Sequence, residues 1–343
     1  MTAQADVGYH ARQHARWHWS EIAFWILALA CAFLFPSRYL IMTDIVRLGL
    51  FALSLDLILG YAGIVSLGHA AFFGVGAYSA GLLALHGVIT EPVIALIVAG
   101  LVATVLGFLT SFLVIRGADL TRLMVTLGIA LLLEALAERF SDITGGTDGL
   151  QGIEMAPILH LFAFDMFGKV GFFYSLSVLF LLFLLARRIV HSPFGLSLRA
   201  IKNNPLRAAA IGIPVNRRLI AIYTVAAFYA GIAGALFTQT TALASLDVFA
   251  FERSADLMLV LVIGGTGYLY GGLIGAVVFR MLQEVFSTIT PQYWQFWIGL
   301  VLIVIVLVGR ARLHRWVLWA PNLIIRQFAG RKAIVAVPES DAS

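Results

Sequence analysis

Two ionisable side chains lie where this sequence is otherwise strongly apolar. Asp56 falls well inside an apolar run, and His69 follows a glycine-rich interruption after that run. Charge at membrane depth is costly and is usually retained for function, and transporters relay protons along chains of such groups. An interhelical polar clamp explains each residue equally well, so both interpretations stay open at this stage.

A second group of charges lies near the ends of apolar runs: Glu134, Glu138, Arg139, Arg280 and Glu284. Glu134 and Glu138 are four residues apart and share one face of a helix, where Arg139 or Arg280 can neutralise one of them. Charged side chains near span ends commonly clamp helices together or reach towards the membrane surface. We therefore favour a structural role for this group.

Motifs for catalysis are missing from the sequence. It contains no G-x-x-x-x-G-K-[ST] loop to cradle phosphates, no H-E-x-x-H zinc motif, and no G-x-S-x-G nucleophile turn. The single cysteine, Cys31, permits no intrachain disulfide. We therefore expect neither an enzyme nor a metal or other cofactor in this chain, and energy for any active process must come from a partner.

The composition indicates that membrane-spanning helices position these residues. Hydrophobic residues make up 61% of the 343 residues, charged residues make up 12%, and the mean hydropathy is +0.96. Soluble domains carry about 25% charged residues, so an ordinary soluble protein is excluded. The net charge of +5 does not indicate nucleic-acid binding, because the cations cluster at the ends of apolar runs.

Apolar segments long enough to span a membrane recur along the chain. They lie at about 21–36, 44–60, 65–86, 93–115, 122–139, 170–187 and 219–241, followed by a broken segment at 255–288 and a last span at 295–309. This pattern predicts an all-α fold, a polytopic transmembrane helical bundle in which glycines break some of the helices.

The distribution of charge predicts the side of the membrane that each loop faces, because Lys and Arg near span ends resist translocation. Cations at Arg12, Arg16 and Arg310–Arg315 predict that the N- and C-termini are both cytoplasmic. Seven cations without a single acid place 187–218 on the same side. The segment 140–169 carries four acids and one lysine, which indicates the outer side.

Termini on one side require an even number of crossings. We predict about ten, provided that the broken segment turns at Gly264–Gly272 and counts as two. The predicted organisation is a cytoplasmic N-terminal segment (1–20), a transmembrane domain (21–309) with a cytoplasmic loop at 188–218, and a cytoplasmic tail (310–343).

Two stretches break the helical pattern in the same way, one at Leu57–Leu83 and one at Leu259–Val278. Each has an apolar half, a glycine turn with polar residues, and a second half rich in small residues. Glycine within a helix costs roughly 1 kcal/mol relative to alanine, so such clusters need a reason. One possible reason is close helix packing, through the pairs Gly271 with Gly275 and Gly231 with Ala235.

Broken helices in corresponding halves of a chain also mark a transport pathway, and we favour this interpretation. Irregular backbone at membrane depth survives only where protein or a water-filled cavity satisfies it. The predicted pathway and gate residues are Asp56, Gly60, Gly63, Ser66, Gly68, His69, Gly264, Gly265 and Gly267.

A short helix is predicted within the basic loop. Asn204 suits its N-cap, Pro205 its first position, and Gly212 its C-terminal stop. Leu206, Ala210 and Ile213 then share one face, with Arg207 turned away. Such a helix can lie on anionic lipid or dock onto a cytoplasmic partner, and its own sequence does not decide between them.

An outer segment, Thr144–Leu150, combines glycines with Thr147 and Asp148. Gly-Gly and Asp-Gly pairs are ordinary turn formers, so a simple turn is one interpretation. The other is contact with an incoming solute or with a binding protein, through Thr144, Gly145, Gly146, Thr147 and Asp148.

Four motifs in order carry a resemblance to a known family. They are GYAGIVSLGHAAFFGVGAY (Gly60–Tyr78), TGGTDGL (Thr144–Leu150), GLSLRAIKNNPLRAAAIGI (Gly195–Ile213) and VLVIGGTGYLYGGLIGA (Val260–Ala276). Together they resemble the permease subunit of the branched-chain amino acid ABC importers, specifically its second, longer type. The resemblance runs from about Leu48 to Gly309.

This resemblance implies that the basic loop supplies a coupling helix that sits in a cleft of an ATPase. The implied docking residues are Arg199, Asn204, Pro205, Leu206, Arg207, Ala210 and Gly212. The acidic residue that is usual in this loop is absent, its place taken within Asn203–Pro205, so contacts that an acid makes with the ATPase are in doubt.

The resemblance also implies partners, location and cargo. They are a second permease subunit in a heterodimer, two cytoplasmic ATPases that bind ATP and Mg²⁺, and a periplasmic solute-binding protein, in a bacterial inner membrane. The expected solute is leucine, isoleucine or valine, although related systems carry other amino acids, amides, urea or aromatic acids. The competing hypotheses are a proton-coupled secondary transporter of a small organic solute and, more weakly supported, a gated channel.

Overall fold

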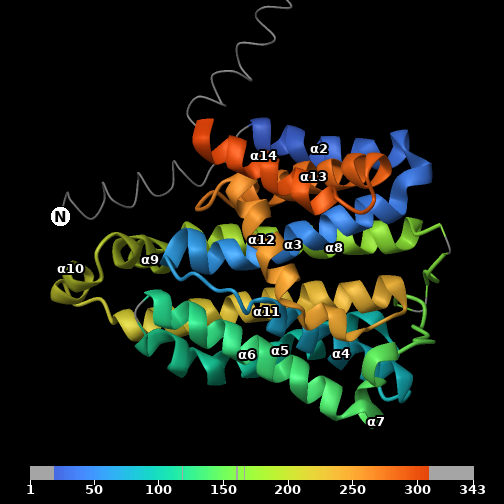
Figure 1. Ribbon diagram of the computed structural model, residues 1–343, viewed down its shortest axis with the longest axis horizontal. Coiled ribbons are helices and arrows are strands. Elements are labelled where there is room, and N and C mark those ends of the chain that lie inside the picture. Colours follow the sequence, from blue (N-terminus) through green and yellow to red (C-terminus); the bar gives the residue numbers. More distant parts are fainter. Residues whose placement is uncertain (1–18, 118, 160, 166, 309–343) are drawn as a thin grey trace, which may run out of the picture. The chain divides into compact units, whose positions relative to one another are not determined.

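The computed structural model describes residues 19–117, 119–159, 161–165 and 167–308 (Figure 1). Helices and the turns between them make up these residues, apart from two isolated β-bridges. The all-α prediction is therefore confirmed for the described part of the chain. Residues 1–18 of the predicted N-terminal segment, and the whole predicted tail at 310–343, lie outside it.

Sixteen helical segments follow one another among the described residues. They are α2 (Trp19–Leu34), η1 (Pro36–Arg38), α3 (Tyr39–Ala62), α4 (Ala70–Leu85), α5 (Pro92–Arg116), α6 (Asp119–Arg139), α7 (Ser141–Thr144), η2 (Gly146–Asp148), α8 (Lys169–Val190), α9 (Pro193–Asn203), α10 (Pro205–Ala210), α11 (Val215–Thr241), η3 (Leu246–Phe249), α12 (Phe251–Gly264), α13 (Leu269–Ile289) and α14 (Trp294–Val308).

Six described helices are long and apolar enough to cross a membrane: Pro36–Ala62, Pro92–Arg116, Leu120–Arg139, Lys169–Val190, Val215–Thr241 and Leu269–Ile289. Shorter apolar helices lie at Glu21–Leu34, Ala70–Leu85 and Trp294–Ile305. Large apolar side chains remain exposed along α5 and α6, as expected where lipid or a partner covers a helix. The chain is therefore a multi-pass membrane protein.

The two predicted breaks in the helical pattern are present. The predicted span at 65–86 starts late, because residues 63–69 are not helical and α4 begins only at Ala70. The predicted broken segment at 255–288 forms α12 and α13, which are separated at 265–268. The predicted basic loop contains a helix that we did not expect, α9, directly before the expected α10.

The chain divides into two compact units, one ending at Met281 and the other beginning at Leu282. In the first unit, α11 packs against α3, α4 and α5 and forms the core. A side chain at Gly76 of α4 would lie 2.1 Å from the carbonyl oxygen of Gly231 of α11, so these helices touch backbone to backbone. In the second unit, Phe286 stacks on Trp297 with the ring centroids 6.2 Å apart.

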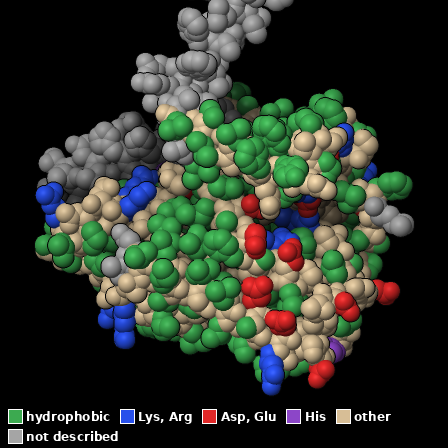
Figure 2. Space-filling view, viewed as in Figure 1, with side chains coloured by type: hydrophobic (Ala, Val, Ile, Leu, Met, Phe, Trp, Pro, Cys, Tyr) green, Lys and Arg blue, Asp and Glu red, His purple; other side chains and the backbone are tan. Residues whose placement is uncertain are grey.

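The two loop regions of the first unit lie at opposite ends of its helices. α9 and α10 extend from one end, and α7 with the 140–168 segment lies at the other (Figure 1). Figure 2 shows acidic side chains gathered in the half of the drawn face that lies away from α9 and α10. This arrangement agrees with the sidedness predicted from charge.

Candidate functional site

The first break begins where a glycine ends α3. Gly63 adopts a left-handed conformation (φ 75°), which glycine reaches without the steric penalty of a Cβ atom. The N–H groups of Gly63 and Ile64 both donate to the carbonyl of Ile58, so the last turn of α3 is capped. The chain then runs irregularly to His69.

Side chains from two other helices hold the irregular backbone of this break. The N–H of Leu67 donates to the hydroxyl of Thr126 on α6 (3.2 Å), and the N–H of Ala70 donates to the hydroxyl of Ser254 on α12 (3.0 Å). Both hydroxyls are buried. These bonds satisfy polar backbone groups that cannot remain unpaired at membrane depth.

The second break lies between α12 and α13. Gly265 (φ 110°) and Gly267 (φ 78°) adopt conformations that residues with a side chain rarely reach. On either side of them α12 and α13 are in backbone contact, since a Cβ on Gly275 would lie 2.1 Å from the carbonyl oxygen of Val260. Close packing and a broken helix therefore occur together in the same glycine cluster.

Asp56 of α3 joins the two breaks. Its Oδ1 accepts a hydrogen bond from the N–H of Gly267 (2.7 Å), and its side chain is completely buried. Gly60, one turn further along α3, lies at the same junction. A Cβ on Gly60 would be 2.1 Å from Asp56 Oδ1 and 2.4 Å from the Gly267 nitrogen, so the contact excludes any larger residue there.

The loop helix α9 reaches this junction from outside the bundle. Lys202 Nζ donates to the carbonyl oxygen of Gly60 (2.6 Å), and the Arg199 guanidinium carbon lies 5.4 Å from the ring centroid of Tyr61. Carbonyls in the last turn of a helix lack a partner within the helix and attract cations. Two loop cations therefore contact the end of α3 that carries the first break.

The short helix α10 has the predicted caps. Asn204 Oδ1 accepts the N–H of Arg207 (3.0 Å), Pro205 is the first residue, and Gly212 follows with a φ of 87°. Ala208 is 2% exposed, whereas Leu206 is 83% exposed.

The exposed apolar residues at α10 differ in one position from the predicted apolar face. Ile211, which is 75% exposed, accompanies Leu206 on the surface, while Ile213 is only partly exposed. The reason is that the helix ends at Ala210, so helical spacing no longer applies to residue 213. Docking by these residues stays a prediction.

His69 and Ser66 are buried within the first break. His69 Nε2 lies 2.8 Å from Ser54 Oγ, and its ring stacks on Phe51 with the centroids 5.7 Å apart. Within the described residues, the Ser66 hydroxyl and His69 Nδ1 have no hydrogen-bond partner. His69 is therefore held mainly by packing and by one hydroxyl.

The outer segment forms a compact turn. Gly145, Gly146 and Gly149 all have positive φ, and the Thr144 hydroxyl donates to the carbonyl of Ala137 (2.5 Å). Thr147 and Asp148 remain exposed. The glycines and Thr144 thus build the turn, and contact through Thr147 and Asp148 with a solute or a binding protein stays a prediction.

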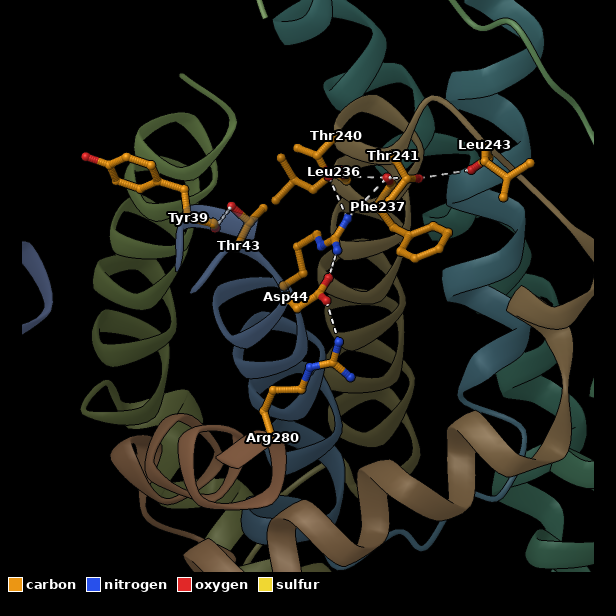
Figure 3. A network of polar contacts seen from close by, with 10 residues as sticks. Tyr39, Thr43, Asp44, Leu236, Phe237, Thr240, Thr241, Leu243 and Arg280 are labelled. Atoms are coloured by element: carbon orange, nitrogen blue, oxygen red, sulfur yellow. Dashed lines mark hydrogen bonds and ion pairs between the residues drawn. The ribbon is translucent and has the colours of Figure 1, made fainter. Parts of the chain in front are cut away.

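Charged residues form a network near the start of α3 that the sequence analysis did not anticipate (Figure 3). The Asp44 carboxylate forms ion pairs with Arg47 and with Arg280 of α13, the latter at 2.6 Å. Arg47 Nη1 also donates to the Thr240 hydroxyl of α11 (2.6 Å). The suggested pairing of Arg280 with Glu134 or Glu138 is wrong, because Arg280 lies against α3 instead.

Comparison with known proteins identifies the family. The family described as "Branched-chain amino acid transport system / permease component" matches residues 38–306. The chain belongs to this family. Its members are permease components of ABC transport systems rather than enzymes. No solved structure matches the chain.

Relatives of the permease are named for more than one cargo. The high-affinity branched-chain amino acid permease protein LivM of Escherichia coli K12 is 27% identical over 253 residues, which are 68% of this chain and 59% of LivM. The match thus spans about three fifths of that relative's length. The probable branched-chain amino acid permease protein LivH of Methanocaldococcus jannaschii is 27% identical over 248 residues (69% and 76%). The autoinducer 2 permease protein LsrD of Escherichia coli SMS-3-5 is 27% identical over 285 residues (80% and 83%).

The structure brings together residues of the permease that the sequence could not connect. Asp56, Gly60 and Gly267 meet, and Lys202 joins them although it was not among the predicted residues. The helix α10, which carries the predicted docking residues, and the Thr144–Asp148 turn lie at opposite ends of the first unit (Figure 1). Asp44 and Arg47 were also missed, although two charges three residues apart in an apolar run are a visible signal.

Proposed function

We propose that the chain is a translocation subunit of an ATP-driven importer for branched-chain amino acids. The observation that carries this proposal is the bond from Lys202 to Gly60, which links a basic loop helix directly to a glycine-broken span. A loop that serves only to anchor the protein on lipid has no need for such a link. A partner that moves the loop would move the break with it.

In the proposed mechanism, closure of two ATPases pulls on α10 through the exposed Leu206, and through Ile211 directly after the helix. α9 ends at Asn203 and α10 begins at Pro205, so the displacement passes back through α9 to Lys202 and on to the end of α3. Asp56 then transmits it to the second break through Gly267. A chain of contacts between two glycine-broken helices is one physical form that alternating access can take.

The proposed topology has ten crossings, made by α2, α3, α4, α5, α6, α8, α11, α12, α13 and α14. Both termini and the 188–218 loop are cytoplasmic, and 140–168 faces the periplasm. The proposed location, a bacterial inner membrane, is what the resemblance to importer permeases implies. The proposed topology is supported by the charge asymmetry of the sequence and by the separation of the two loop regions.

Labelling with an impermeant maleimide tests this topology. Single cysteines at Ser141 and Ala209, both exposed, would be introduced in a Cys31→Ser background. In intact cells with a permeabilised outer membrane, Ser141→Cys should react and Ala209→Cys should react only after lysis. Reaction in the opposite order would invert the topology.

The proposed assembly contains a second permease subunit, two ATPases with ATP and Mg²⁺, and a periplasmic solute-binding protein. The exposed Thr147 and Asp148 are the proposed contact for the binding protein or the solute. LivM and LivH, both branched-chain amino acid permeases by name, support a branched-chain cargo, and LsrD indicates autoinducer 2 as the competing cargo.

Uptake into proteoliposomes tests the function itself. The complete assembly should accumulate leucine only with internal ATP, and collapse of the proton gradient should leave that uptake unchanged. Uptake by the permease alone, driven by a proton gradient, would instead establish the secondary-transporter hypothesis. ATP-driven uptake of another cargo in place of leucine would retain the importer and change its substrate.

A further inference from the structure

A cavity of about 350 Å³ lies at the end of the first unit where α3 and α8 begin and α11 ends, away from the two glycine breaks. Its walls are the first turns of α3 and α8, the last turn of α11, and four residues that precede α8, namely Ile153, Met155, Phe164 and Asp165. Pockets for small ligands begin at about 300 Å³, so the volume suits a molecule the size of an amino acid. Arg47, in its wall, precedes Asp56 by nine residues along α3, about 14 Å of helix.

One wall of this cavity holds a fixed cation. Arg47 is 6% exposed and is oriented by Asp44, by the Thr240 hydroxyl and by the ring of Phe237, whose centroid lies 5.0 Å from the guanidinium carbon. Its Nη1 donates to the carbonyl of Phe237 and to the hydroxyl of Thr240, and its Nη2 forms the ion pair with Asp44. A guanidinium held in this way is suited to bind a carboxylate.

A fixed anion lies in the same cavity. The two oxygens of the Asp165 carboxylate accept the N–H groups of Lys169 (3.2 Å) and Val170 (2.9 Å), which anchors the side chain at the start of α8. A carboxylate offers about four lone-pair directions, so two backbone bonds leave room for an ammonium group. The wall therefore presents opposite charges from two separate elements.

One helix end at the cavity holds the cation. α11 ends at Thr241, and Arg47 Nη1 donates to the carbonyl oxygen of Phe237 (3.3 Å) near that end. Carbonyls at the C-terminal end of a helix carry partial negative charge, so they stabilise the guanidinium there.

Part of the remaining wall is apolar, beside the polar side chains of Thr43, Gln239 and Thr241. Leu40, Ile153, Met155 and Phe164 contribute aliphatic and aromatic surface to the cavity. A ligand with an apolar part next to its charged groups therefore fits the space better than a simple inorganic ion.

We propose that this cavity is an entry site for the zwitterion of an aliphatic α-amino acid. Arg47 binds the α-carboxylate, Asp165 binds the α-ammonium group, and the wall around Met155 holds the side chain. Asp44 is a positioning residue that holds Arg47. The proposal rests on the proposed function, since it names the site where the imported solute is first held by the permease.

Direct binding to the purified permease–ATPase complex, without binding protein, tests the recognition of each group. Radiolabelled leucine should bind, and two analogues should compete at least about tenfold less well, the loss of one charge-assisted hydrogen bond. One is 4-methylpentanoate, which lacks the ammonium group, and the other is isoamylamine, which lacks the carboxylate. Equal competition by leucine and isoamylamine, or no binding of leucine, would overturn the proposal.

Arg47→Gln gives a readout that a merely structural role cannot produce. Leucine should lose its advantage over isoamylamine in this variant, while its advantage over 4-methylpentanoate is retained. Arg139→Gln, an exposed arginine at the end of α6 outside the cavity, is the matched control and should retain both advantages. A uniform loss of affinity for all three ligands in Arg47→Gln would count against carboxylate recognition.

Filling the cavity gives an independent test if Arg47→Gln does not fold. Met155→Trp places a large side chain in the wall and should weaken leucine binding at least about tenfold. Leu161→Trp is the control, because Leu161 lies in the same segment, is exposed, and does not line the cavity. Unchanged binding by a folded Met155→Trp complex would refute the site.

These experiments distinguish failure of the entry-site proposal from failure of the proposed function. If the parent assembly accumulates leucine with ATP and Met155→Trp does so with unchanged KM, the importer stands and the cavity is not an entry site. If the parent assembly shows no ATP-driven uptake of leucine, the importer proposal itself fails, whatever the binding assays give.

Discussion

Lys202 Nζ lies 2.6 Å from the carbonyl oxygen of Gly60, so a loop lysine completes the C-terminal end of a membrane-embedded helix. The two residues are 142 positions apart in sequence. Gly60 is also the position at which Asp56 and Gly267 leave no space for a side chain. A displacement of α9 therefore acts at the point where both broken helices meet.

Lys202→Met should uncouple the loop from the first break. The variant keeps the apolar stem of the side chain and removes the charged donor, so the complex should assemble normally. Leucine uptake should fall about fivefold or more, because a net hydrogen bond is worth about 1 kcal/mol. Arg139→Met, at the exposed C-terminal end of α6, is the control and should transport like the parent. Parent-like uptake by Lys202→Met would remove this lysine from the coupling path.

Gly60→Ala should destabilise the junction. The added methyl group would lie 2.1 Å from Asp56 Oδ1 and 2.4 Å from the Gly267 nitrogen, so one of the two breaks must move. Overpacking of this kind typically costs about 1–3 kcal/mol, which should appear as a lower Tm of the purified complex. Gly128→Ala on α6 meets no atom within 4 Å and should leave the Tm unchanged or slightly raised. Equal Tm values for the two variants would contradict the described contact.

Asp56 can be assigned to a clamp or to a proton relay by two substitutions. Asp56→Asn retains an oxygen that accepts the N–H of Gly267, whereas Asp56→Ala leaves that N–H buried without it. For a clamp, the Asn variant should transport nearly normally and the Ala variant should lose about 1–3 kcal/mol of stability. For a relay, the Asn variant should already be inactive, since an amide cannot carry the proton. Uptake and thermal unfolding measured side by side distinguish the two outcomes.

Leu206→Asp should prevent docking of the ATPase without harming the fold. Leu206 is 83% exposed in the permease, so the substitution alters a surface that only a partner would bury. An unpaired charge in a partner's apolar groove is expensive, and co-purification of the ATPase should be lost.

Arg207→Gln is the neighbouring control, because Arg207 is also exposed and a surface ion pair is worth at most about 1 kcal/mol. The opposite pattern, with Leu206→Asp assembling normally and Arg207→Gln failing, would indicate that α10 binds lipid phosphates.

Sequence alone determined the features of this protein that depend on local pattern. Helical spans follow from runs of apolar residues, because a segment in lipid must satisfy its backbone within itself. The caps of α10 at Asn204 and Gly212 follow from residue types whose preferences act over a single turn. The two breaks followed from glycines clustered where a helix would otherwise continue, and the family followed from four motifs in order.

Only the tertiary structure decided which of these elements touch. Nothing in the spacing of Asp56, Lys202 and Gly267 shows that they share one junction, because contacts between helices depend on how side chains and backbones pack in three dimensions. The same is true of Arg280, whose partner proved to be Asp44 on α3, 236 residues earlier in the chain. A pairing rule for one helix face cannot choose among carboxylates on different helices, since the free energy of an ion pair depends on distance and burial that packing alone sets.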